Sequence, residues 1–160
     1  MQTIATDSPL NQHQEQLLNF LLGRMIPADH ALGVPGADDP TVFADVKQSL
    51  GRDENTLQIQ TMRDGLDATA LLAQTRELDL AQIATEQLPP LLLEVQGSVK
   101  NFYTNLVTLA TQCYYRDTRV MESLGMAPRA PFPEGFELED GDWSLLDPVR
   151  ERGPIWRKTR

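Results

Sequence analysis

The sequence predicts an all-α fold: a small helical bundle around one long central helix, followed by an extended, proline-rich C-terminal arm. The main observation is an apolar period of three and four residues between positions 92 and 113, which places those side chains on one face of an α-helix. A second is that no segment alternates polar and apolar residues as a half-buried strand does. The apolar face consists of Leu92, Val95, Val99, Phe102, Leu106, Leu109 and Cys113.

We expect this central helix to begin near Pro90 and to continue without a break through Cys113. Proline suits a first helical turn because the N–H that it lacks has no partner there. At 1.5 Å per residue the apolar face is roughly 32 Å long, about the width of a small domain. Gly97 lies inside the helix, where it either marks the close approach of another backbone or is simply a weak point.

Two shorter helices are predicted nearer the N-terminus, from residues that typically begin or end a helix. Ser8-Pro9 fits the N-cap and first position of a helix that must stop at Pro27, since the residue before a proline avoids the α region. Asp39-Pro40 opens a second helix in the same way, and Gly51 ends it.

Three further helices follow from weaker signals. One spans residues 56–75, and a short one opens at Asp79, which with Gln82 has the form of a capping box. The last begins at Asp117 and closes at Gly125.

The loop between the first two helices is predicted to have a defined conformation set by Pro27, Asp29, Pro35 and Gly36. Pro35 and Gly36 fit a type II turn, which requires a positive φ at the glycine. Asp29 and the adjacent His30 either form a small metal or acid–base site or satisfy loop backbone groups through local hydrogen bonds.

The charge of the chain is unevenly distributed. The whole chain of 160 residues carries −9, so nucleic acid and anionic membranes are poor partners. Residues 150–160 hold five basic residues against one acidic residue, a net charge of +4, which leaves −13 on residues 1–149. No apolar run is long enough to span a membrane, so we expect no membrane insertion.

Residues 1–125 are predicted to form the helical domain and residues 126–160 the arm. The arm loses helical periodicity and contains five prolines, yet it holds both tryptophans of the chain, which is unlike a disordered tail. These side chains must be buried on the helical body or on a partner protein. We expect the partner-binding residues to be Phe132, Phe136, Trp143, Leu146, Arg150, Ile155, Trp156 and Arg157.

Catalytic motifs are not evident in the sequence. It contains no phosphate-binding glycine loop, dinucleotide fingerprint or nucleophile elbow. The single cysteine, Cys113, excludes an intramolecular disulfide; on the apolar face it is expected to be a buried core residue, the alternative being a reactive thiol. We expect no catalytic, cofactor-binding or metal-binding residues in this chain.

Three segments resemble one known family. Residues 25–29 (MIPAD), 33–37 (GVPGA) and 42–45 (VFAD) are similar to the gluconate 2-dehydrogenase subunit 3 family, sharply over residues 17–50 and only in general pattern over 56–124. The resemblance implies a non-catalytic small subunit of a hetero-oligomer. Its partner would be a large glucose-methanol-choline (GMC) type oxidoreductase that carries FAD and oxidises a sugar, polyol or alcohol, and the small subunit would assist its maturation and solubility.

The first residues differ from those of exported members of that family, which begin with a twin-arginine signal. Here the first arginine is Arg24, so a cytoplasmic complex is favoured over a periplasmic one exported by a signal on another chain. Two other functions remain open: a stand-alone helical protein-binding module, and an enzyme that uses the loop with Asp29 and His30.

Overall fold

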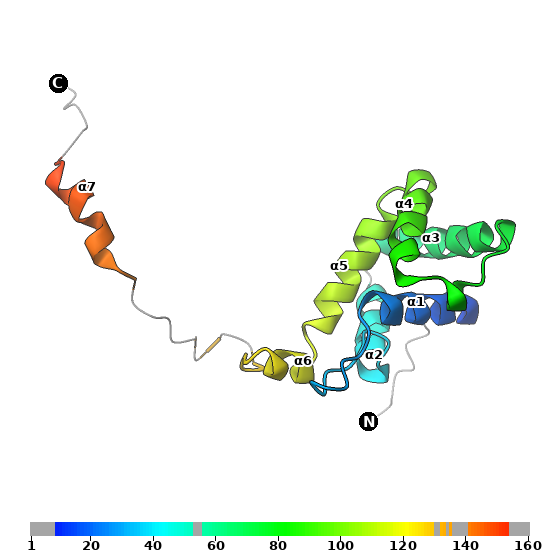
Figure 1. Ribbon diagram of the computed structural model, residues 1–160, viewed down its shortest axis with the longest axis horizontal. Helices are drawn as coiled ribbons and strands as arrows, with labels where there is room; N and C mark the ends of the chain where they lie inside the picture. Colours follow the sequence, from blue (N-terminus) through cyan, green and yellow to red (C-terminus); the bar gives the residue numbers. More distant parts are fainter. Residues whose placement is uncertain (1–8, 53–55, 130–131, 134, 136–140, 154–160) are drawn as a thin grey trace, which may run out of the picture. The chain divides into compact units, whose positions relative to one another are not determined.

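A computed structural model describes residues 9–52, 56–129, 132–133, 135 and 141–153. Helices make up 67% of the described residues, and no strand occurs among them, as the sequence predicts. The chain divides into two units, residues 1–128 and residues 129–160. The first unit contains α1 (Gln12–Met25), α2 (Pro40–Leu50), α3 (Thr56–Thr75), η2 (Leu80–Gln82), η3 (Thr85–Gln87), α4 (Leu88–Ser98), α5 (Phe102–Tyr114) and α6 (Thr118–Ser123) (Figure 1).

The predicted continuous helix from Pro90 to Cys113 is wrong, because it is two helices, α4 and α5, separated at residues 99–101. Val99 leaves the helical conformation, and Asn101 adopts a left-handed one with φ of 68°. Asn is among the few residues other than glycine that enter this region readily. The side chain of Gln96 then accepts a hydrogen bond from the Thr104 amide at 3.0 Å, so α4 satisfies a backbone donor in the first turn of α5.

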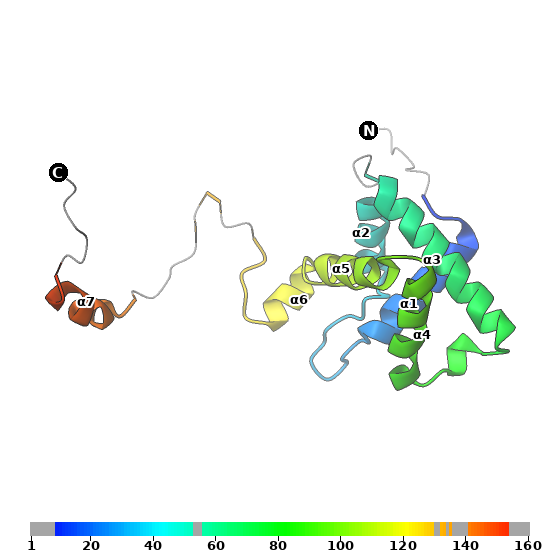
Figure 2. The same ribbon diagram turned by 90° about the horizontal axis from the view of Figure 1, so that it is seen from above.

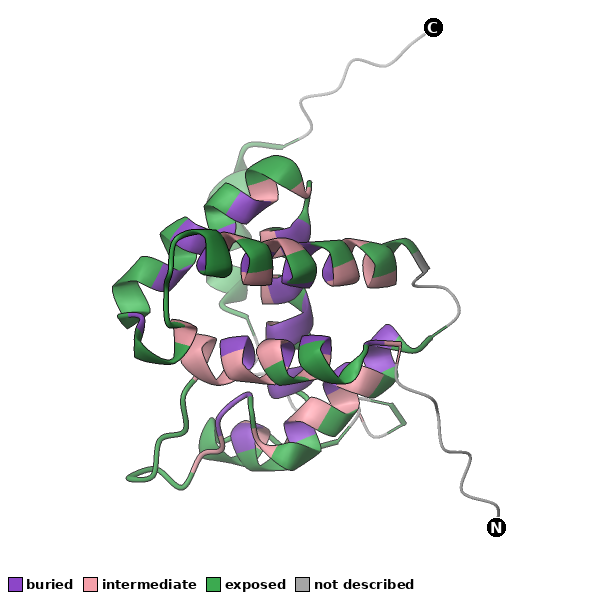
Figure 3. Ribbon diagram, turned by 90° about the vertical axis from the view of Figure 1, so that its right-hand side faces the viewer, coloured by how far each residue is buried: buried purple, intermediate pink, exposed green. Residues whose placement is uncertain are grey.

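The second of these helices, α5, has three helical neighbours in the first unit. It packs against α2, α3 and α4, while α1 lies against α3 (Figure 2). The apolar period crosses the break because both helices turn their apolar sides to one core, seen as the buried inner faces in Figure 3. The largest fully buried side chains include Phe102, Leu106, Leu92, Leu18, Leu21, Leu22 and Met62.

Gly65, in α3, permits the closest contact in this core. A Cβ atom at Gly65 would overlap the aromatic ring of Phe102, so the ring lies directly on the α3 backbone. Gly97, the glycine for which the sequence suggested such an approach, has open space around it. Of the two alternatives considered for Gly97, the second therefore holds: this glycine is a weak point inside α4.

The ends of α1 and α2 depend on polar side chains. The N-cap of helix α1 is Asn11 rather than Ser8, because Asn11 and Gln14 form a reciprocal capping box. Helix α2 begins as predicted, with the Asp39 side chain accepting from the Thr41 amide and Pro40 at the first position. Gly51 ends α2, also as predicted.

Later boundaries agree in part. Helix α3 has the predicted bounds, and Asp117 and Gly125 begin and end α6 as predicted, Gly125 with φ of 72°. The short helix expected from Asp79 is instead two 3₁₀ turns, η2 and η3, the first of which Asp79 caps through the Ala81 amide.

The second unit also contains helical structure that the sequence analysis missed. A 3₁₀ turn, η4 (Trp143–Leu146), continues into a short helix, α7 (Asp147–Glu151), with Pro148 at its start. The Asp142 side chain caps η4 by accepting from the Ser144 amide at 3.0 Å. Among the described residues, no helix is long and apolar enough to cross a membrane.

Candidate functional site

The loop between α1 and α2 folds back on itself through backbone hydrogen bonds. The Asp29 and Val34 amides each donate to the other residue's carbonyl, at 3.0 and 2.9 Å. The Asp29 carboxylate accepts from the amides of Ala31 and Leu32, at 2.9 and 3.1 Å. Asp29 therefore shapes the loop by satisfying local backbone groups, the second of the two roles considered for it.

The predicted turn at Pro35 and Gly36 is wrong in its geometry. Gly33 is the loop residue with positive φ, at 67°, and Gly36 is not in that region. Gly36 is required for another reason: it is buried, and a Cβ atom there would lie 2.9 Å from the Ala28 nitrogen. Glycine is therefore needed at position 36 because two parts of the loop pack closely there, and not because the backbone has a positive φ.

Arg119, in α6, holds this loop to the end of α5. Its guanidinium contacts both oxygens of Asp39, at 2.7 and 3.2 Å, and both oxygens of Asp117, at 3.0 and 2.8 Å. Each aspartate also caps a helix, α2 and α6 respectively. One arginine thus joins the starts of two helices that are far apart in the sequence. Hydrogen bonds from Arg119 lower the pKa of both carboxyl groups.

The loop and Arg119 line a shallow hollow of about 440 Å³ that includes His30 and Asp38. His30 is exposed, Asp29 is engaged by the loop backbone, and Asp39 is engaged by Arg119. Among the described residues, no group of three His, Cys, Asp or Glu side chains is arranged to hold a metal ion. Of the four predicted loop residues, Pro35 and Gly36 line the hollow, whereas Pro27 and Asp29 do not.

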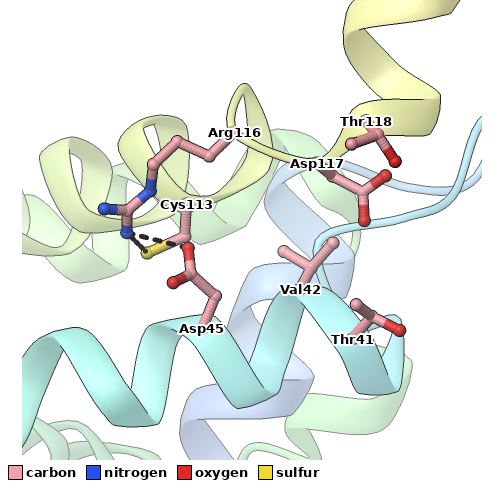
Figure 4. A pocket seen from close by; sticks show the side chains of 7 residues that line it. All are labelled: Thr41, Val42, Asp45, Cys113, Arg116, Asp117 and Thr118. Carbon is pink, nitrogen blue, oxygen red and sulfur yellow. Dashed lines mark hydrogen bonds and ion pairs between the residues drawn. The ribbon is translucent and has the colours of Figure 1, made fainter. Parts of the chain in front are cut away.

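A second hollow, of about 280 Å³, lies beside Cys113 between α2 and the end of α5 (Figure 4). Arg116 pairs with Asp45 at 2.8 Å and donates to the Cys113 sulfur at 3.3 Å. The same guanidinium donates to Ser49 at 2.8 Å. Cys113 is only 1% exposed, and burial raises the pKa of its thiol. It is therefore a buried core residue, as the sequence predicts, and its raised pKa keeps the thiol protonated at neutral pH.

The predicted partner-binding residues of the arm are only partly within the described structure. Phe136, Ile155, Trp156 and Arg157 lie outside the described residues. The remaining four, Phe132, Trp143, Leu146 and Arg150, are all exposed. Phe132 is 86% exposed and Trp143 66%, which is unusual for aromatic side chains.

Sequence reasoning missed Arg119 and Gly65, and only Arg119 left a local signal. Arg119 lies two residues after the predicted cap Asp117, a distance over which an arginine can return to the cap carboxylate. Its second partner, Asp39, lies 80 positions away and could not be found without the fold.

Comparisons with protein-family models, with curated proteins and with solved structures find no match to this chain.

Proposed function

We propose that this chain is the non-catalytic small subunit of a hetero-oligomeric oxidoreductase. It binds, stabilises and helps to mature a large FAD-dependent subunit of the GMC type that acts on a sugar, polyol or alcohol. FAD belongs to the large subunit, and this chain contributes no catalytic residue. The sequence likeness over residues 17–50 suggests the family, and the loop in that region is the one ordered by Asp29, Gly36 and Arg119.

The observation that carries the proposal is the exposure of apolar side chains in residues 124–149. Scattered apolar residues on a protein surface need no explanation, but this segment gathers many large ones. Aromatic and aliphatic side chains of this kind are the usual anchors of protein interfaces. They are Leu124, Met126, Phe132, Trp143, Leu145, Leu146 and Val149.

The first unit has, by contrast, a closed core of its own. Most of its buried apolar residues, from Leu10 to Val120, form one cluster. This supports a division of roles in which residues 1–128 fold by themselves and residues 129–160 supply contacts to a partner. The same observation favours a second candidate, a stand-alone helical binding module, because such a module would also be a stable monomer.

Co-expression with a large FAD-binding chain of the GMC type, if a neighbouring reading frame encodes one, separates the two functions. The small-subunit function predicts that both chains co-purify at a fixed ratio and that the flavin absorbance elutes with the complex. Elution of this chain as a flavin-free monomer, with the large chain fully soluble and active alone, would favour the binding module.

A further inference from the structure

The segment Asp142–Arg152, which we call the anchor segment, has its own helical structure without burying any of its side chains. Every residue from 141 to 153 is exposed. The segment is held by local interactions: Asp142 caps η4 through Ser144, and Arg150 pairs with Asp147 at 3.1 Å. A helical run this short is marginal in water, so lasting order requires packing against another surface.

The apolar side chains of the anchor segment gather toward one side. In a 3₁₀ turn, residues three apart eclipse each other, so Trp143 and Leu146 lie in line along η4. Val149 follows three residues after Leu146, in α7. Residues three apart on a helix are neighbours on its surface, so Val149 lies next to Leu146. Trp143, Leu146 and Val149 therefore form a short ridge, with Leu145 beside it at 74% exposure.

Charges are ordered along the arm on both sides of this ridge. Residues 134–142 contain five acidic residues and no basic one, whereas residues 150–160 carry a net charge of +4. The arm is thus acidic, then apolar, then basic. A surface that matches it must be basic, then apolar, then acidic, because opposite charges meet across protein interfaces.

The same order argues against a membrane as the occupant. Anionic lipid attracts basic amphipathic segments, but the acidic residues directly before Trp143 would oppose that attraction. The arm, with 35 residues, is also long enough to supply one side of a standard protein interface, which uses about 20–30 residues. Charge order and length both favour a folded protein partner.

From these observations we propose that the anchor segment docks in an apolar groove on the large subunit, a groove flanked by basic residues at the end nearest Asp142 and by acidic residues at the end nearest Arg150. Trp143 and Leu146 enter the groove, and Arg150 and Arg152 meet the acidic end. This inference rests on the proposed function and specifies the partner's chemistry. The local caps reduce the entropy that the segment loses on binding.

Affinity measurements with the full-length chain and the purified large chain test this proposal. Trp143→Ala and Leu146→Ala should each weaken binding at least tenfold, and Trp143→Phe by less than Trp143→Ala. Leu57→Ala removes a leucine that is 82% exposed on α3 and should leave affinity unchanged. Raising the salt concentration should weaken the wild type and leave a smaller salt effect in Arg150→Gln, since only the charged contacts are screened.

Each alternative has its own result. If removal of residues 129–160 abolishes binding while both alanine variants bind normally, the anchor is elsewhere on the arm and this inference fails, although the proposed function stands. If the wild type does not bind the large chain, both fail. A homodimer that Trp143→Ala dissociates would assign the ridge to a second copy. Equally, Trp143-dependent binding to vesicles of phosphatidylserine would assign it to a membrane, and either result would overturn the proposal.

Discussion

The contact between Phe102 and Gly65 offers the sharpest test of the fold. Phe102 is fully buried at the start of α5, and its ring lies against the α3 backbone at Gly65. Phe102→Ala should destabilise the protein by about 3–5 kcal/mol, the range for large-to-small changes at buried aromatic residues. For a unit of this size the melting temperature should fall by roughly 10–20 °C.

Gly65→Ala makes the prediction specific to this contact. In a helix, alanine is ordinarily about 1 kcal/mol better than glycine. Here the added methyl group would overlap the Phe102 ring, so the change should instead cost about 1–3 kcal/mol. When Phe102 is already alanine, the overlap disappears and Gly65→Ala should become neutral or stabilising.

Chemical denaturation of the four proteins in this double-mutant cycle measures the coupling, with Leu93→Ala on the exposed side of α4 as a control expected to change little. A coupling energy of about 2 kcal/mol or more is expected, with a reversal of sign for Gly65→Ala. Additive effects of the two substitutions would refute the packing of α5 on α3 described above.

Three other predictions concern single side chains, each measured by denaturation. Gly97→Ala should stabilise the protein by about 0.5–1 kcal/mol, because Gly97 is helical and has open space around it. Gly36→Ala should cost about 1–3 kcal/mol through overlap with the loop backbone, and a neutral result would refute that packing. Arg119→Met should cost about 1 kcal/mol at pH 7. Because the pKa values of Asp39 and Asp117 are lowered in the folded state, that contribution is complete above the unfolded carboxyl pKa of about 3.9 and is lost as the pH falls through the lowered values. A difference between wild type and Arg119→Met that persists unchanged at pH 2 would contradict this assignment.

Local signals predicted helix type and many helix ends from sequence. Asp39-Pro40 and Gly51 bound α2 because a capping side chain, an N-terminal proline and a terminal glycine act within a few residues of the chain. The break between α4 and α5 was missed because the apolar period continues across it. Asn101 was the available signal. Asparagine tolerates the left-handed conformation that this residue adopts between the end of α4 and the start of α5.

Contacts between distant segments were not accessible to sequence reasoning. Glycine is needed at position 65 because the ring of Phe102, 37 residues later in the sequence, packs against it. Glycine is needed at position 36 because the backbone of the same loop, at Ala28, lies close to it. Nothing in the local pattern separates these glycines from Gly97, which has open space around it. Helix α7 was not predicted because proline generally disfavours a helix, although Pro148 lies in the first turn, where proline is tolerated.

Flavin loading of the large chain tests the proposed function most directly. A large FAD-binding chain of the GMC type, sought in the neighbouring reading frames, would be expressed alone, with the full-length chain, and with a variant that ends after Pro128, and its soluble yield and bound flavin would be measured in each case. We expect high yield and near-complete flavin loading only with the full-length chain. Equal yield, equal loading and equal dehydrogenase activity in all three cases would contradict the proposal that this protein is a maturation and stability subunit.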